Sequence, residues 1–191
     1  MAKQDFSNLT GKILIASPYT MEGKVFHQSM IYVIQHNKEG SVGLIINHPV
    51  NNAPANNLFK KLDANIDLGK LDLEVHLGGP VEMERGFFLH TNEYSKNLLF
   101  TPIEDGLAVS SNVQIVKDIS DGDGPKKSLF IIGYTGWGEN QLEFELENNL
   151  WIVAEPNLDL IFDEDADDKW HKALSTLGIS KYEFAPDIAS C

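Results

Sequence analysis

Polar side chains stand at the ends of several apolar runs in this sequence, and some of them are of types that transfer protons. His36, Asn47 and His90 each follow such a run, and Arg85 comes just before the run that ends at His90. If these positions converge in the fold, they would supply two imidazoles, an amide and a cation to one site. One interpretation is therefore a pocket for acid–base chemistry.

A glycine-rich stretch offers a place where these groups could meet. Residues 133–145 read GYTGWGENQLEFE and follow the apolar run 128–132, which predicts a buried strand that breaks into a turn and then a helix. In open α/β sheets, ligands usually lie at such strand ends. The glycine spacing is not the dinucleotide fingerprint, and no Lys-Ser/Thr pair follows to make a phosphate loop. The predicted candidate pocket comprises His36, Asn47, Arg85, His90, Trp137, Gln141 and Glu143.

A purely structural interpretation of the same residues is also open. Strand ends collect polar groups, so His36 and His90 could be hydrogen-bonded to the backbone and Asn47 could cap a turn. Trp137 could belong to the core. The sequence contains no His-Glu-x-x-His, Gly-x-Ser-x-Gly or Ser-x-x-Lys motif and no ligand spacing typical of zinc. We therefore assign no catalytic residue, no metal and no cofactor from the sequence.

The elements that must position these side chains are strands mixed with helices. Two apolar runs joined by Asn37–Gly40 predict a hairpin, because such a loop often needs a glycine at positive φ. The segment 141–151 fits both strand and helix spacing, and its Gln, Leu and Glu content favours helix. The chain is therefore predicted to be a single α+β (mixed α/β) domain over residues 1–191. The predicted strands are 12–16, 29–36, 41–47, 73–77, 86–90, 98–101, 107–110, 128–132 and 151–154, and the predicted helices begin after Pro54 and cover 113–119, 141–150 and 165–177.

Composition limits the possible partners. The 191 residues carry a formal charge of −13, and residues 139–168 hold eleven acidic residues without Lys or Arg. A polyanion would be repelled by that face, which disfavours direct nucleic-acid binding. The single cysteine, Cys191, allows no intrachain disulfide, and no apolar run approaches the length of a membrane helix. We expect a cytoplasmic protein that does not enter membranes.

The following segments and residues stand in this order along the chain: Gly11-Lys12, Leu14, ASP (16–18), SMIYVIQH (29–36), GLIIN (43–47), Pro49, LGGPV (77–81), RGFFLH (85–90), GYTGWG (133–138), QLE (141–143), Trp151, 161–162 and 170–178. Taken together, they resemble the AlgH (YqgE) family of bacterial proteins. The resemblance implies a compact fold with a bifurcated, barrel-like mixed sheet flanked by helices, and an association with transcriptional regulation. It supplies no catalytic residues. The sequence departs from the family pattern at His27, where Arg is usual, and at Glu139-Asn140, where Pro-Gly is common.

Two functions remain open at this point. The first is a non-enzymatic binding or regulatory protein that acts through a protein or small-molecule partner, with an oligomeric state that the sequence leaves open. The alternative is a hydrolase-type enzyme that uses His36, His90 and Glu143 in a pocket beside the turn at residues 133–138. The enzyme requires both histidines and Glu143 to line one open pocket within reach of a common point.

Overall fold

The computed structural model describes residues 6, 8–18, 25–50, 74–95, 100–102 and 106–179. Its strands form one sheet of nine in the order β6-β7-β5-β8-β3-β2-β1-β9, with β4 paired to β8. The strands are β1 (Ile13–Ala16), β2 (Met30–Asn37), β3 (Gly40–Ile45), β4 (Val75–Leu77), β5 (Val81–Thr91), β6 (Phe100–Pro102), β7 (Leu107–Ser110), β8 (Ser128–Trp137) and β9 (Trp151–Ala154). The helices are α2 (Gln114–Ser120), α3 (Gln141–Glu147), α4 (Leu158–Phe162) and α5 (Ala166–Thr176).

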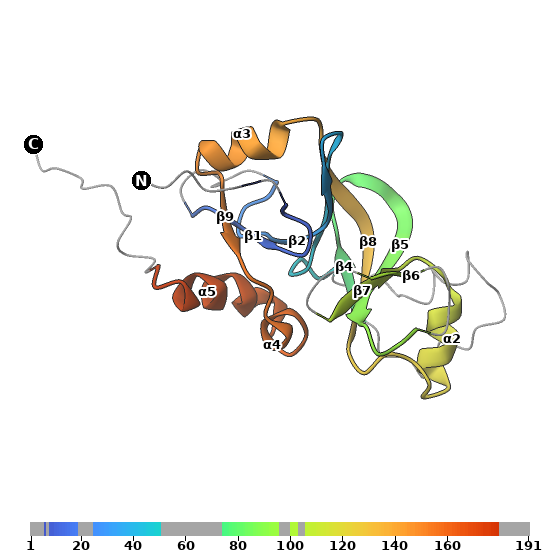
Figure 1. Ribbon diagram of the computed structural model, residues 1–191. Helices are drawn as coiled ribbons and strands as arrows, with labels where there is room; N and C mark the ends of the chain where they lie inside the picture. The colour runs from blue at the N-terminus through green and yellow to red at the C-terminus, as the bar shows by residue number, and fades with distance from the viewer. Residues whose placement is uncertain are drawn as a thin grey trace, which may run out of the picture.

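Strand β8 joins the two halves of this sheet, which are β6-β7-β5 and β3-β2-β1-β9 (Figure 1). One of its edges pairs antiparallel with β5, and the other pairs first with β4 in parallel and then with β3 antiparallel. Gly133, at the change of partner, has a φ of +70°, and a Cβ there would lie 2.6 Å from the carbonyl oxygen of Gly79. The prediction that the strand breaks at these glycines was therefore wrong. The strand continues to Trp137, and Gly133 supplies the kink that divides the sheet.

The predicted hairpin is confirmed as β2 and β3. Its last register pair is Asn37 with Gly40, and Gly40 has a φ of +137°. The register shifts between Val33 and Gln35, where a bulge increases the local twist.

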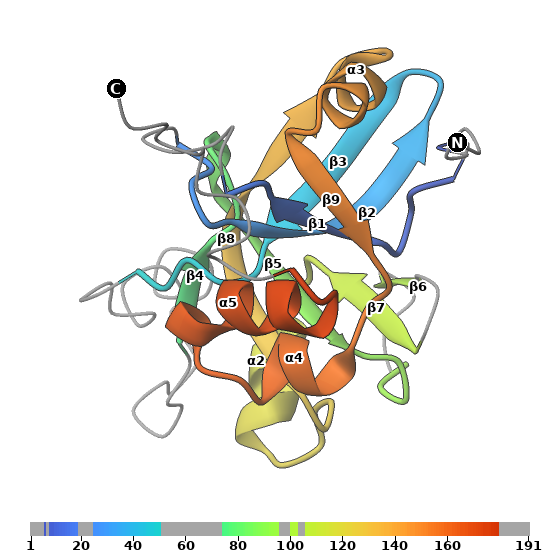
Figure 2. The ribbon, with the colours of Figure 1, turned by 90° about the vertical axis from the view of Figure 1, so that its left-hand side faces the viewer.

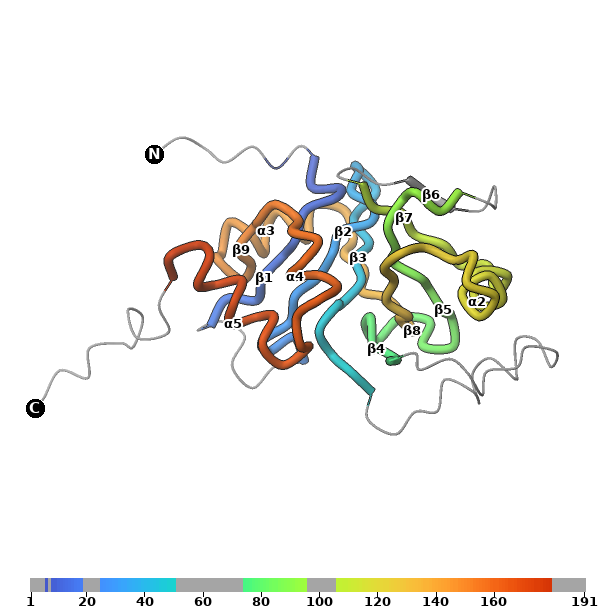
Figure 3. The backbone as a smooth tube through the Cα atoms, turned by 90° about the horizontal axis from the view of Figure 1, so that it is seen from below, coloured from blue at the N-terminus to red at the C-terminus, as the bar shows by residue number. Residues whose placement is uncertain are grey.

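Helices cover both faces of the sheet. Alternate residues of β1 enter different clusters: Ile13 and Ile15 pack with α4 and α5, whereas Leu14 and Ala16 pack with α3 and with Trp137 and Trp151. This alternation is the period of two expected of a strand buried on both faces. Figures 2 and 3 show α4 and α5 beside the β1–β2 half of the sheet and α2 beside the β5–β7 half. Helix α2 contributes Ile115 and Val116 to a third cluster, with Phe88 and Phe130.

The expected fold class is confirmed: the protein has a mixed α+β fold with a bifurcated sheet flanked by helices. Among the described strands, β6 and β9 end the strand order, so the sheet stays open and does not close into a barrel. Helix α4 was missed in the sequence, although Asn157 marks its start by accepting a hydrogen bond from the Leu160 amide. The helix expected after Pro54 lies outside the described residues. No described helix is long and apolar enough to cross a membrane.

Candidate binding site

His36 and Glu143, two of the predicted site residues, are neighbours. The ring of His36 bonds through Nε2 to the carbonyl oxygen of Phe6 (3.0 Å) and through Nδ1 to the hydroxyl of Ser41 (2.8 Å). A carbonyl oxygen only accepts, so Nε2 carries a proton and donates to Phe6. The Glu143 carboxylate lies 3.7 Å from Nε2, and the His36 side chain is only 4% exposed. Both ring nitrogens are thus used to hold the chain together.

Trp137 and Gln141 meet at a carboxylate that the sequence interpretation missed, that of Glu145. One Glu145 oxygen accepts from the indole nitrogens of Trp137 (2.8 Å) and Trp151 (2.7 Å), and the other accepts from the Gln141 amide (3.0 Å). Gln141 in turn accepts from the Gly138 amide, which joins the start of α3 to the end of β8. The only available signal was the four-residue spacing of Gln141 and Glu145, which places both on one face of a helix.

Asn47 and His90 both brace the backbone. Asn47 accepts from the Met30 amide (2.7 Å) and donates to the Gln28 carbonyl (2.8 Å). His90 is completely buried, with Nδ1 donating to the Thr91 carbonyl and Nε2 accepting from the Ser110 hydroxyl. Burial lowers the pKa of His90, so its ring is neutral at pH 7. These contacts agree with the structural interpretation of the strand-end residues.

The predicted residues therefore do not share one pocket. His90 pairs with Ser128 at the start of β8, whereas Ser41, the partner of His36, pairs with Trp137 at its end. Nine residues of extended chain span roughly 30 Å. The geometry that the hydrolase interpretation requires is absent from these residues, because the two histidines lie near opposite ends of one strand.

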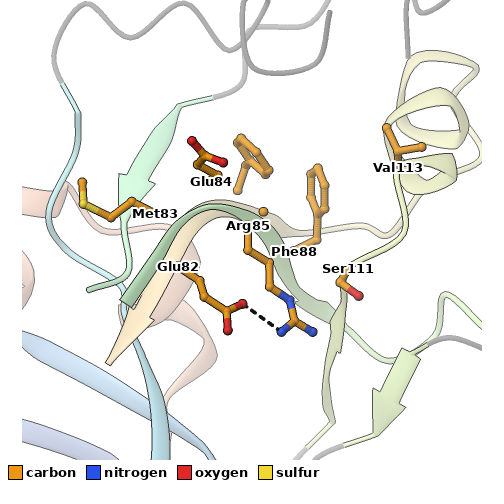
Figure 4. A pocket seen from close by; sticks show the side chains of 9 residues that line it. Glu82, Met83, Glu84, Arg85, Phe88, Ser111 and Val113 are labelled. Atoms are coloured by element: carbon orange, nitrogen blue, oxygen red, sulfur yellow. Dashed lines mark hydrogen bonds and ion pairs between the residues drawn. The ribbon is translucent and has the colours of Figure 1, made fainter. Parts of the chain in front are cut away.

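Arg85 lines a ligand-sized pocket that is formed by described residues (Figure 4). The pocket has a volume of about 630 Å³ and lies beside an arch of β5 formed by residues 82–85, which separate the β8 pairings of Val81 and Gly86. A volume of this size is typical of small-molecule sites. The lining residues are Glu82, Met83, Glu84, Arg85, Gly86, Phe88, Ser111, Val113 and Phe130.

Aromatic rings form the apolar part of this pocket. Phe88 and Phe130 pack with ring centroids 4.8 Å apart, and a Cβ on Gly86 would lie 2.9 Å from the Phe130 ring. The absence of a side chain at Gly86 thus allows the ring to approach the strand. Figure 4 shows Glu84, Phe88 and Val113 on one side of the arch, with Glu82 and Arg85 on the other.

The charged residues of the pocket are partly paired. The Arg85 guanidinium lies 3.2 Å from the Glu82 carboxylate and 5.1 Å from the centre of the Phe87 ring. Tyr134 donates to Glu82 at 3.2 Å, and desolvation together with this hydrogen bond raises the pKa of the Tyr134 hydroxyl. With two carboxylates and one cation, the rim of the pocket is acidic.

A buried polar group that the sequence interpretation did not identify lies around Lys169. The Lys169 ammonium donates to the carbonyls of Ile161 (2.6 Å) and Ile46 (3.2 Å), and burial lowers the pKa of Lys169 to about 8. His76 is completely buried, and burial followed by repulsion from Lys169 lowers its pKa to about 4. Neither side chain lines the pocket at Arg85. We interpret the group as part of the core that joins α5 to the sheet.

A second hollow of about 490 Å³ lies between α5 and the β1–β9 edge, and none of the predicted site residues lines it. Within the described ranges, no three His, Cys, Asp or Glu side chains are grouped so that they could hold a metal ion.

Known proteins resemble this chain over its full length. An AlgH-like family profile matches residues 13–182. The chain is 45% identical to UPF0301 proteins of Rickettsia typhi and Rickettsia prowazekii over 190 residues, covering all of both chains. The solution structure of the AlgH protein from Pseudomonas aeruginosa matches with a TM-score of 0.77 and 28% identity, covering all of both chains.

A crystal structure from Corynebacterium diphtheriae shares the fold, with a TM-score of 0.71, 18% identity, and coverage of 92% of this chain and 90% of that one. The profile and the full-length relatives together show that the chain belongs to the AlgH-like family.

Proposed function

We propose that this protein is a non-enzymatic binding or regulatory protein of the cytoplasm, whose protein or small-molecule partner occupies the pocket at Arg85. The observation that supports this proposal is the pocket itself: about 630 Å³, with Phe88 and Phe130 packed together and charged groups at its rim. Binding sites commonly combine an apolar lining with a few polar groups that orient the ligand.

The contacts of the other predicted residues argue against the hydrolase alternative. His36 and His90 each use both ring nitrogens in contacts with neighbouring groups of the chain, and the pairing of β8 places them at its two ends. A general base must reach the proton that it removes. Regulation by direct DNA binding is also disfavoured, because a net charge of −13 opposes contact with phosphates.

The pocket can be tested by filling it. Ser111 is exposed and lines the pocket, so Ser111→Trp should place an indole in the cavity without disturbing the core. We expect the neutral apolar dye Nile red to bind the wild type and to bind Ser111→Trp about tenfold more weakly, measured by fluorescence titration.

Ser175→Trp is the matched control, because Ser175 is exposed on α5 and outside the pocket. Both variants should melt close to the wild-type temperature. Absence of dye binding to the wild type, or equal loss in both variants, would count against a binding function for this pocket.

A further inference from the structure

Within the described part of the chain, the outer edge of β5 has no strand partner along part of its length. Strand β7 pairs with β5 only from Phe88 to Thr91, and it ends at Ser110, after which the chain turns into α2. No strand among the described residues pairs with this edge of β5 before Phe88, and residues 81–85 are all exposed. Unpaired amide and carbonyl groups at a sheet edge can accept an additional strand.

The pocket lies directly beside this open edge. Ser111 and Val113, which follow the end of β7, form one wall, and Gly86 and Phe88 of β5 form another. An extended segment that continues the position of β7 would therefore run along β5 and pass over the pocket. Because alternate side chains of a strand point to the same face, one apolar side chain of that segment could enter between Phe88 and Val113.

The charges beside the edge favour a basic segment. Glu82 and Glu84 stand on the arch, and the single cation, Arg85, already pairs with Glu82. The whole chain carries a formal net charge of −13, so a second copy of this protein would bring further negative charge to the same edge. Like charges facing each other across a strand pair are destabilising, whereas opposite charges stabilise the pair. The arch thus disfavours self-pairing and favours a partner that carries Lys or Arg.

We propose that the open edge of β5 at residues 83–86 binds an extended, Lys- or Arg-bearing segment of a partner protein as an added strand, with an apolar side chain of that segment in the pocket of Phe88, Val113 and Phe130. Glu82, which has a left-handed φ of +44°, marks the end of this edge. This inference rests on the proposed function, because it uses the same pocket, and it specifies the partner as a basic protein segment and the binding mode as strand addition.

Three panels of short blocked peptides test the inference against the full-length protein. The first panel alternates Lys or Arg with Leu, Val or Phe; the second replaces each basic residue with Glu; and the third repeats the first with alternate backbone amides N-methylated. We expect binding from the first panel by fluorescence anisotropy, with losses of about tenfold or more in the other two. Like charges across the strand pair explain the loss in the second panel, and missing ladder hydrogen bonds explain the loss in the third panel.

A matched pair of variants locates the site. Glu84→Gln should weaken binding of the basic peptides several-fold, and Glu39→Gln, a change of the same kind in the exposed β2–β3 turn, should leave it unchanged. Equal binding of the N-methylated panel, or an equal effect of the two variants, would overturn strand addition. Failure of every peptide in a protein that still binds Nile red through the pocket would also overturn it, and the proposed function would stand. If the wild type also failed to bind Nile red, both the strand-addition inference and the proposed function would be overturned.

Discussion

At the scale of single residues, Glu145 holds two buried indoles in place. One of its carboxylate oxygens accepts hydrogen bonds from the indoles of Trp137 and Trp151, both of which are buried. Glu145→Ala leaves two buried donors without their acceptor and should lower the free energy of unfolding by about 1–3 kcal/mol. Chemical denaturation followed by tryptophan fluorescence measures this loss.

Two comparisons make the Glu145 prediction specific. Glu145→Gln keeps an amide oxygen as acceptor and should cost less than Glu145→Ala. Glu147→Ala, on the exposed face of the same helix, should change stability little. If Glu145→Ala and Glu147→Ala were equally stable, the carboxylate would not be holding the two indoles.

At the scale of elements, the kink in β8 depends on one glycine of the three in residues 133–138. Gly133 has a φ of +70° and is packed against the Gly79 carbonyl, whereas a Cβ on Gly136 would meet no atom closer than 3.8 Å. We expect Gly133→Ala to destabilise the protein by about 1 kcal/mol or more, through backbone strain and the close contact. Gly136→Ala should leave stability nearly unchanged. Thermal denaturation of the two variants measures the difference, and equal melting temperatures would contradict the assigned role of Gly133.

Local signals predicted elements better than they predicted the meeting of distant side chains. The β2–β3 hairpin followed from its turn residues between two apolar runs, and helix α3 followed from its content of Gln, Leu and Glu. These signals act over a few positions. The course of β8 was mispredicted, because three glycines normally indicate a turn and only the pairing with β3 shows that the strand continues.

The pocket at Arg85 shows the same limit of local signals. Arg85 was identified as a residue beside a strand, but the pocket around it requires Val113 and Phe130 from elements far along the chain. His36 and His90 were correctly placed near strand ends, yet nothing in the sequence shows at which end of the sheet each strand finishes. Sheet pairing decides that, and it depends on contacts between residues distant in sequence.

At the scale of the whole molecule, buried histidines should make the fold sensitive to acid. Burial holds the pKa of His76 at about 4 against an ordinary value of 6.5, and the pKa values of His48 and His90 are also lowered, chiefly by burial. Below pH 6.5 these histidines bind protons in the unfolded chain that they do not bind in the folded chain. Their contribution to stability is therefore complete above that pH and is lost as the pH drops toward 4. For His76 the difference between 6.5 and about 4 corresponds to roughly 3 kcal/mol at most.

Denaturation midpoints measured from pH 7.5 to pH 4.5 test this linkage. His76→Gln should flatten the decline below pH 6.5, even if the variant starts from a lower stability, because its amide does not titrate. His171→Gln, an exposed position on α5, serves as the control and should keep the wild-type slope. A His76→Gln slope equal to that of the wild type would show that His76 does not contribute to the acid response.

The position of β1 in the sheet has a consequence for synthesis of the chain. Strand β1 is made before the other described strands, yet it pairs on one side with β9, and the carbonyl of its last residue, Ala16, accepts from the indole of Trp170. While the ribosome is still translating the segment before Trp151, the nascent chain holds an apolar strand whose outer edge has no partner. Such an edge is a template for aggregation. Completion of the C-terminal third therefore covers the first strand, and a ribosome that stalls before it would release a product that aggregates.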